Sequence, residues 1–164
     1  MNWNFRLRQL PTALKRLVLF FLTALLFGYG ASFWVLADQT ELTPNGIEES
    51  YNGNEDNENA TTIKFRKSKF EVLTTVHSHV FTLGMLFLLT GFLVYFTDLQ
   101  PGLRQFLMIE PPISLIISFS SLIMMWQGYP IFKYLAYLSG ALMHSTFIIG
   151  IILIIREVLQ TRKV

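Results

Sequence analysis

Three histidines and one glutamate interrupt the apolar runs of this sequence, and they are the residues whose chemistry most needs an explanation. His77 and His79 lie two residues apart in the stretch TTVHSHVFTLG, residues 74–84, and His144 lies in a later apolar run. Neutral imidazole ligates haem iron, binds other metals and carries protons. The carboxylate of Glu110 exchanges protons or binds cations. The chain has no cysteine, which excludes thiolate ligands and disulfides.

The spacing of the histidines decides which of them can act together. On a helix, residues two apart point about 200° apart, so His77 and His79 cannot bind one metal from the same helix. His79 and His144 fall at similar depths of two apolar runs, and two imidazoles on facing helices are the axial ligands of a b-type haem. Four interpretations stay open: haem or another metal between His79 and His144, a metal or cofactor site that also uses His77, a proton path, and plain hydrogen bonds to hydroxyl or carbonyl groups across helix contacts.

Glu110 begins the second feature, because two prolines follow it in the sequence IEPP. Ser114, Ser118 and Ser121 continue on its face at three- and four-residue steps. Proline suits a first helical turn and a carboxylate there meets the positive end of the helix dipole, so IEPP predicts a helix start with Glu110 near the lipid headgroups. The other interpretation is a cytoplasmic entry for protons or cations, with a path along the serines toward the histidines. The burial of Glu110 distinguishes the two.

Four apolar runs must position these residues. Residues 17–37, 72–97, 106–127 and 131–155 each reach the roughly 20 residues that cross a bilayer, and lipid forces such segments to be helical. The chain is 52% hydrophobic and its mean hydropathy is +0.44, which is too apolar for an ordinary soluble domain. The sequence predicts an all-α membrane protein, a four-transmembrane-helix bundle, as a single domain over residues 1–164. The first run is longer than the apolar core of a signal peptide, which favours a permanent helix.

Charge sets the expected orientation. Most Lys and Arg residues lie on the cytoplasmic side if both termini are inside, so we expect an N-in/C-in topology in the inner membrane of a bacterium. Residues 38–71 would then form a long external loop, and the acidic, Asn-rich composition of about 40–60 predicts a mobile segment. The run 72–97 carries special residues on two faces, His79 on one and His77 with glycines on the other, which predicts the most buried helix.

Three function classes follow from these observations. The first is an accessory subunit or assembly factor of a larger membrane complex. The second is an electron-transfer protein with haem b between His79 and His144, and the third is proton or cation translocation through the Glu110, serine and histidine seam. The expected partners are the lipid bilayer and other membrane subunits or a second copy of the chain, because four helices enclose little volume. A formal charge of +2 with scattered basic residues argues against nucleic-acid binding.

Overall fold

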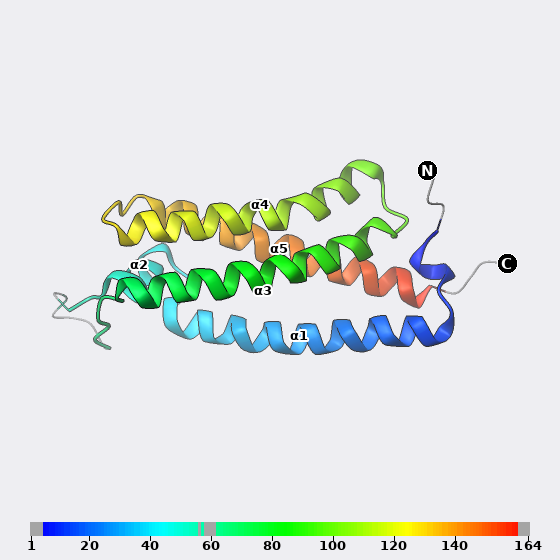
Figure 1. Ribbon diagram of the computed structural model, residues 1–164, viewed down its shortest axis with the longest axis horizontal. Helices are drawn as coiled ribbons and strands as arrows, with labels where there is room; N and C mark the ends of the chain where they lie inside the picture. Colours follow the sequence, from blue (N-terminus) through cyan, green and yellow to red (C-terminus); the bar gives the residue numbers. More distant parts are fainter. Residues whose placement is uncertain (1–4, 56, 58–61, 161–164) are drawn as a thin grey trace.

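Five α-helices and one short 3-10 helix make up the part of the chain that the computed structural model describes, residues 5–55, 57 and 62–160. Four long helices lie lengthwise beside one another, and the short α2 lies at one end of the bundle (Figure 1). The first and last described residues both lie at the opposite end. The elements in chain order are η1 (Leu7–Gln9), α1 (Thr12–Thr40), α2 (Pro44–Asn52), α3 (Lys69–Tyr95), α4 (Pro101–Trp126) and α5 (Phe132–Leu159).

The four long helices correspond to the four runs of the sequence. Within the described residues, α1, α3, α4 and α5 are long and apolar enough to cross a membrane, and no β-strand is formed. The predicted fold class, an all-α bundle of four candidate membrane-spanning helices, is therefore confirmed.

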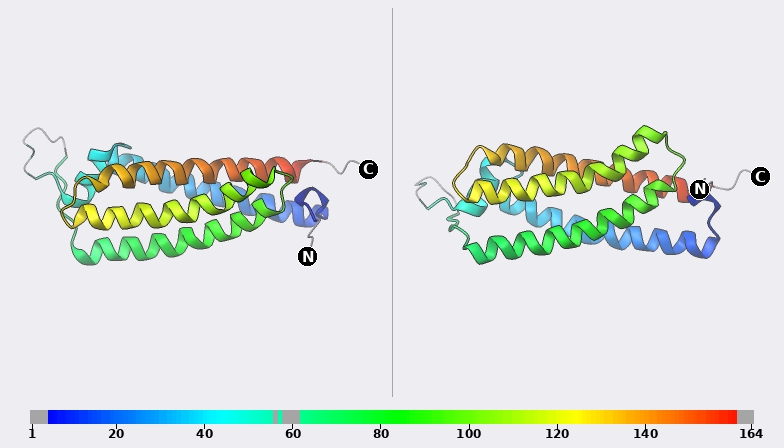
Figure 2. Two further views of the ribbon diagram at one scale, coloured as in Figure 1. Left: turned by 90° about the horizontal axis from the view of Figure 1, so that it is seen from above. Right: turned by 45° about the horizontal axis from the view of Figure 1, so that its top comes forward.

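The helices are buried to very different extents. The contact between α4 and α5 is the most extensive, α3 packs mainly on α4, and α1 packs on α5 and α2 (Figure 2). Half of the most apolar stretch of α4 is buried, against 22% of that of α3. The prediction that the 72–97 helix is the most buried is wrong, because the face with Phe81 and Thr82 is exposed and α4 and α5 form the centre.

Two prolines shape α4. The helix begins at Pro101, so the prediction that it starts at IEPP is wrong, and Pro111 and Pro112 lie inside it. A proline inside a helix has no N–H to donate, and Pro112 leaves the carbonyl of Met108 without its helical hydrogen bond. The first turns of α4 lean away from the rest of the helix (Figures 1 and 2), which is the bend that internal prolines produce. At this level a Cβ on Gly91 of α3 would lie 3.7 Å from the Met108 carbonyl oxygen, so the two backbones are close.

The segment after α1 is folded where the sequence predicts mobility. Residues 44–52 form α2, whose N-cap Thr43 accepts a hydrogen bond of 3.0 Å from the backbone N–H of Gly46. A Cβ on Gly46 would lie 1.9 Å from the backbone oxygen of Thr40, so only glycine fits between α2 and the end of α1. The prediction of a mobile loop is wrong for these residues. The same prediction also covers residues 56 and 58–60, which lie outside the described part of the chain.

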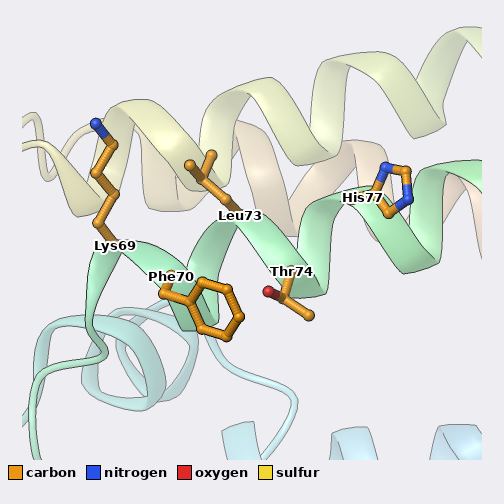
Figure 3. Close-up of a pocket in the computed structure, with 5 residues that line it drawn as sticks. All are labelled: Lys69, Phe70, Leu73, Thr74 and His77. Atoms are coloured by element: carbon orange, nitrogen blue, oxygen red, sulfur yellow. The ribbon is translucent and has the colours of Figure 1, made fainter.

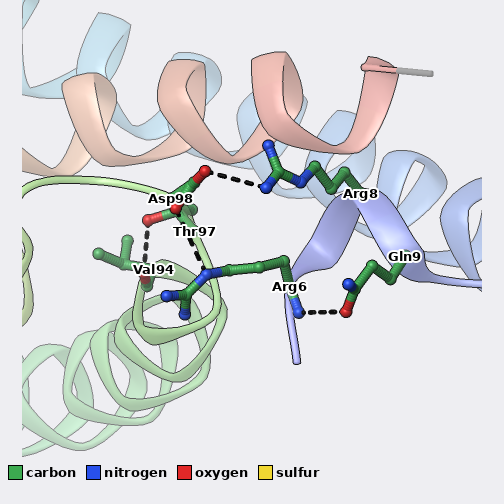
Figure 4. Close-up of polar contacts among 6 residues, drawn as sticks. All are labelled: Arg6, Arg8, Gln9, Val94, Thr97 and Asp98. Atoms are coloured by element: carbon green, nitrogen blue, oxygen red, sulfur yellow. Dashed lines mark hydrogen bonds and ion pairs between the residues drawn. The ribbon is translucent and has the colours of Figure 1, made fainter. Parts of the chain in front are cut away.

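The opposite end of the bundle is closed by the segment before α1. Leu7 is 2% exposed, and its backbone N–H donates a hydrogen bond of 3.0 Å to the Phe96 carbonyl. Arg6 and Arg8 reach the carboxylate of Asp98 at 3.5 and 3.1 Å (Figure 4). Exposed ion pairs of this kind contribute little to stability. The burial of Leu7 therefore accounts for most of the stability with which the segment before α1 is attached to the α3–α4 connection.

Candidate functional site

Glu110 lies deep inside the bundle. At 1.5 Å per residue it is about 14 Å from the start of α4 and about 24 Å from its end. Its side chain is 8% exposed. The glutamate lies in the interior of α4 and is not a helix cap, so the capping interpretation of IEPP is wrong.

Both oxygens of this carboxyl group have hydroxyl partners from two helices. Ser114, one turn further along α4, donates to Oε1, and Thr146 Oγ1 on α5 forms a hydrogen bond with Oε2. Thr146 Oγ1 also lies 2.8 Å from the carbonyl oxygen of Leu142. None of the three ion pairs within the described residues includes Glu110. Neutral hydroxyl groups, and no cationic side chain, satisfy the carboxyl group.

The predicted serines extend this site along the same helix contact. Ser118 and Ser121 are buried; Ser118 donates to the Ala136 carbonyl of α5 at 3.3 Å, and Ser121 donates to its own helix at 2.7 Å. These two hydroxyls bond to backbone, so they do not continue a chain of side-chain hydrogen bonds from Glu110. We call the following residues the α4–α5 polar seam: Glu110, Ser114, Ser118 and Ser121 of α4, with Ser139 and Thr146 of α5.

His144 faces a different helix from the seam. It lies two residues from Thr146 and so points to the other side of α5. Its Nδ1 is 2.5 Å from the hydroxyl oxygen of Tyr29, and its ring centroid is 5.6 Å from that of Phe33. Both partners belong to α1, so His144 joins α1 to the rest of the bundle.

The other two histidines are exposed on α3. His79 Nδ1 lies 2.9 Å from the Thr75 carbonyl oxygen, and its ring contacts Phe119 of α4 at 5.8 Å. His77 lines a shallow depression formed by the first turns of α3 alone, together with Lys69, Phe70, Leu73 and Thr74 (Figure 3).

The structure does not gather the histidines around one point. The contacts of His79 are with α3 and α4, whereas those of His144 are with α1. Within the described residues, no group of three or more His, Asp and Glu side chains could hold a metal ion. The hydrogen bonds of both imidazoles are made by Nδ1, so a haem between His79 and His144 would have to be ligated through Nε2 of each ring.

Sequence reasoning missed two polar residues of α5. Thr146 completes the Glu110 site, and Glu157 lies eleven residues further on the same face, about 16 Å along the helix. Glu157 is 7% exposed, and its Oε1 has no hydrogen-bond partner within the described residues. One sequence signal could have found them. Ser139, Thr146 and Glu157 follow one another at seven and eleven residues in an apolar run, which places them on one face of a helix.

At the α2 end of the bundle, the charged residue Lys67 has a structural role. Lys67 Nζ lies 4.1 Å from the ring centroid of Tyr51, and its backbone carbonyl accepts a hydrogen bond of 2.9 Å from Trp126. Burial lowers the pKa of Lys67, an effect that the charge of Glu71 opposes, and burial raises the pKa of Tyr51. These contacts attach α2 and the start of α3 to the end of α4.

Residues 41–164 match the family model of Aq_1264_TM, a transmembrane helical domain. The chain belongs to this family. No curated protein and no solved structure matches it. The family and the four apolar helices make the chain an integral membrane protein, with a lipid bilayer as its environment. The match begins where α1 ends, so the domain comprises α2 to α5 and contains the whole polar seam.

Proposed function

We propose that this membrane protein binds and releases a proton or a monovalent cation at Glu110, as part of proton or cation translocation. The buried carboxyl group carries the proposal. An ionisable side chain within a membrane span is costly and is a functional hypothesis by default. Glu110 has neither an ion-pair partner within the described residues nor a capping position, so neither of these common structural roles accounts for it.

The surroundings of Glu110 fit a site that is loaded and emptied. Ser114 and Thr146 hold the carboxyl group from two helices, and Pro111 and Pro112 follow it directly, where α4 has fewer backbone hydrogen bonds. A change in the bend of α4 would alter the contact with Thr146. Since the hydroxyls of the seam do not form a continuous path, translocation would require such a movement or a second copy of the chain.

The proposal is tested with purified protein in liposomes that contain a pH-sensitive dye. An imposed potassium diffusion potential should drive proton flux through the wild-type protein, and a sodium-sensitive dye in parallel liposomes reports cation flux. Glu110→Gln should abolish this flux, because the amide keeps the shape of the side chain and cannot exchange a proton. Glu41→Gln, the same chemical change at an exposed position between α1 and α2, is the matched control and should keep the flux. Equal flux from Glu110→Gln and the wild type would disprove the proposal.

A second candidate is the accessory-subunit role, which the exposed surface of α1 favours. Phe20, Phe27 and Trp34 are 75%, 83% and 77% exposed, and α1 packs only against one side of the bundle. A partner subunit would cover this surface in place of lipid. Native mass spectrometry of protein extracted from its own membrane in mild detergent should then give a stoichiometric complex. A bare monomer would contradict this role.

Haem binding between His79 and His144 stays a prediction with a simple test. The protein purified after haem supplementation should show the sharp visible bands of a reduced b-type haem, and either His79→Ala or His144→Ala should remove them. Colourless protein would disprove it.

A further inference from the structure

The hydroxyl groups of the Glu110 site have fewer protons than the hydrogen-bond acceptors around them. A hydroxyl group has one proton to donate and two lone pairs that accept. Thr146 Oγ1 lies within hydrogen-bond distance of three acceptors: Glu110 Oε2, the Leu142 carbonyl at 2.8 Å and the Met143 carbonyl at 3.2 Å. The single proton of Thr146 cannot serve both the carboxyl group and its own helix.

Two arrangements of protons are consistent with these positions. In the first, Glu110 is an ionised carboxylate that accepts from Ser114 and Thr146, and a negative charge stays in the bilayer without a cation. In the second, Glu110 is a carboxylic acid whose O–H donates to Thr146, while Thr146 donates to the Leu142 carbonyl and Ser114 donates to Oε1. The second satisfies every group and buries no charge, which strongly favours it.

We propose that Glu110 is held as a neutral carboxylic acid whose O–H donates to Thr146 Oγ1, so the species bound at this site is a proton and not a metal cation. The inference rests on the proposed function and names its ligand. The side-chain oxygens that the structure brings together here are the two carboxyl oxygens of Glu110 and the hydroxyl oxygens of Ser114 and Thr146, and the carboxyl group is the one among them that carries charge when ionised.

Few titratable groups lie near this carboxyl group. On α4, Arg104 precedes it by six residues and lies 5.4 Å from the ring centroid of Tyr95. On the face of α5 toward the seam, Glu157 is about 16 Å further along the helix. On α3, residues 80–94 contain no titratable side chain. No cation from these elements is placed to neutralise an ionised Glu110.

Infrared spectroscopy of the full chain in lipid tests the inference directly. At neutral pH the wild-type protein should show the C=O stretching band of a neutral carboxylic acid, and this band should be lost in Glu110→Gln. Glu157→Gln removes the other deeply buried carboxyl group of the seam face and should leave the Glu110 band in place. If the carboxylic acid C=O region is the same in the wild type and in Glu110→Gln, Glu110 is ionised and the inference is overturned.

Variants of the acceptor test the direction of the hydrogen bond. Thr146→Val removes the hydroxyl with little change of shape, so the acid band should remain and shift to higher frequency as the O–H loses its acceptor. Thr146→Ser restores a hydroxyl and should return the band to its wild-type position. An unshifted band in Thr146→Val would overturn the proposed donation to Thr146.

A hydrophobic carbodiimide distinguishes the proton from a metal cation, because it reacts with neutral buried carboxyl groups. Mass spectrometry should find the label on Glu110, with a labelling rate that does not change when sodium chloride replaces choline chloride. Protection by sodium would overturn the inference in favour of a metal cation. An acid band at Glu110 without flux in liposomes would refute the proposed function alone, whereas flux without the band would refute this inference alone.

Discussion

Replacing Thr146 by valine should destabilise the bundle more than removing a buried hydroxyl that bonds only within its own helix. Thr146 contributes the hydrogen bond that joins Glu110 of α4 to α5. Valine has nearly the same shape, so the change leaves no cavity and removes only this polar contact. An interhelical hydrogen bond in a membrane contributes about 0.6 kcal/mol on average and up to about 1.7 kcal/mol. Because Glu110 is buried and would lose a partner, we expect a loss in the upper part of this range, about 1–2 kcal/mol.

Thr90→Val is the matched control for this prediction. Thr90 is as buried as Thr146, but its hydroxyl donates only to carbonyls of its own helix, at 2.8 Å to Leu86 and 3.4 Å to Phe87. Removing a bond of this kind should cost no more than about 0.5 kcal/mol. Reversible unfolding by sodium dodecyl sulfate in mixed micelles, followed by helical circular dichroism, gives both values.

A double-mutant cycle assigns the loss to the pair. With Glu110→Leu as the second change, Thr146→Val no longer leaves a buried oxygen unsatisfied, so its cost should fall by at least about 1 kcal/mol. If Thr146→Val costs no more than Thr90→Val, or if the two changes at the site are additive, the contact between α4 and α5 does not depend on the Glu110 hydrogen bond.

Three further predictions concern the docking of α2, the attachment of α1 and the orientation in the membrane. Gly46→Ala places a methyl group against the backbone of Thr40, so α2 should undock and its amides should lose protection in hydrogen exchange; unchanged protection would contradict this contact. Tyr29→Phe removes the hydroxyl that bonds His144, and the same unfolding assay should report a loss of about 1 kcal/mol, with no change arguing that α1 is attached by apolar contacts alone. A reporter fused after Val164 should be active only in the cytoplasm, as the positive charges predict, and activity outside would reverse the orientation.

The number and position of the long helices could be read from the sequence, because lipid leaves a polypeptide few choices. A run of about 20 apolar residues can satisfy its backbone in a bilayer only as a helix, so composition alone fixes the four spans. The stripe of Ser114, Ser118 and Ser121 on the face of Glu110 was also predicted, since helical periodicity follows from spacing. Each of these inferences uses the sequence of a single segment and needs no knowledge of its neighbours in the fold.

The wrong predictions concern the start of α4 and the segment after α1, where contacts between residues far apart in the chain decide the structure. IEPP is typical of a helix start, yet residues 101–109 are good enough helix formers to extend α4 backwards, and the bundle then encloses Glu110. An acidic, Asn-rich segment is typical of a mobile loop, yet Tyr51 is buried in the structure and Lys67 contacts the ring of Tyr51. In both cases a distant partner supplies the stabilisation.

The sequence by itself determined a four-helix membrane protein and the polar stripe on its third long apolar run. Only the tertiary structure decided which helix meets that stripe, and therefore that Thr146 bonds Glu110 while His144 turns to Tyr29. The physical reason is that lipid is as apolar as the helix surfaces, so hydropathy assigns no helix to a particular neighbour. Close packing and the pairing of buried polar atoms make that choice, and both depend on residues far apart in the chain.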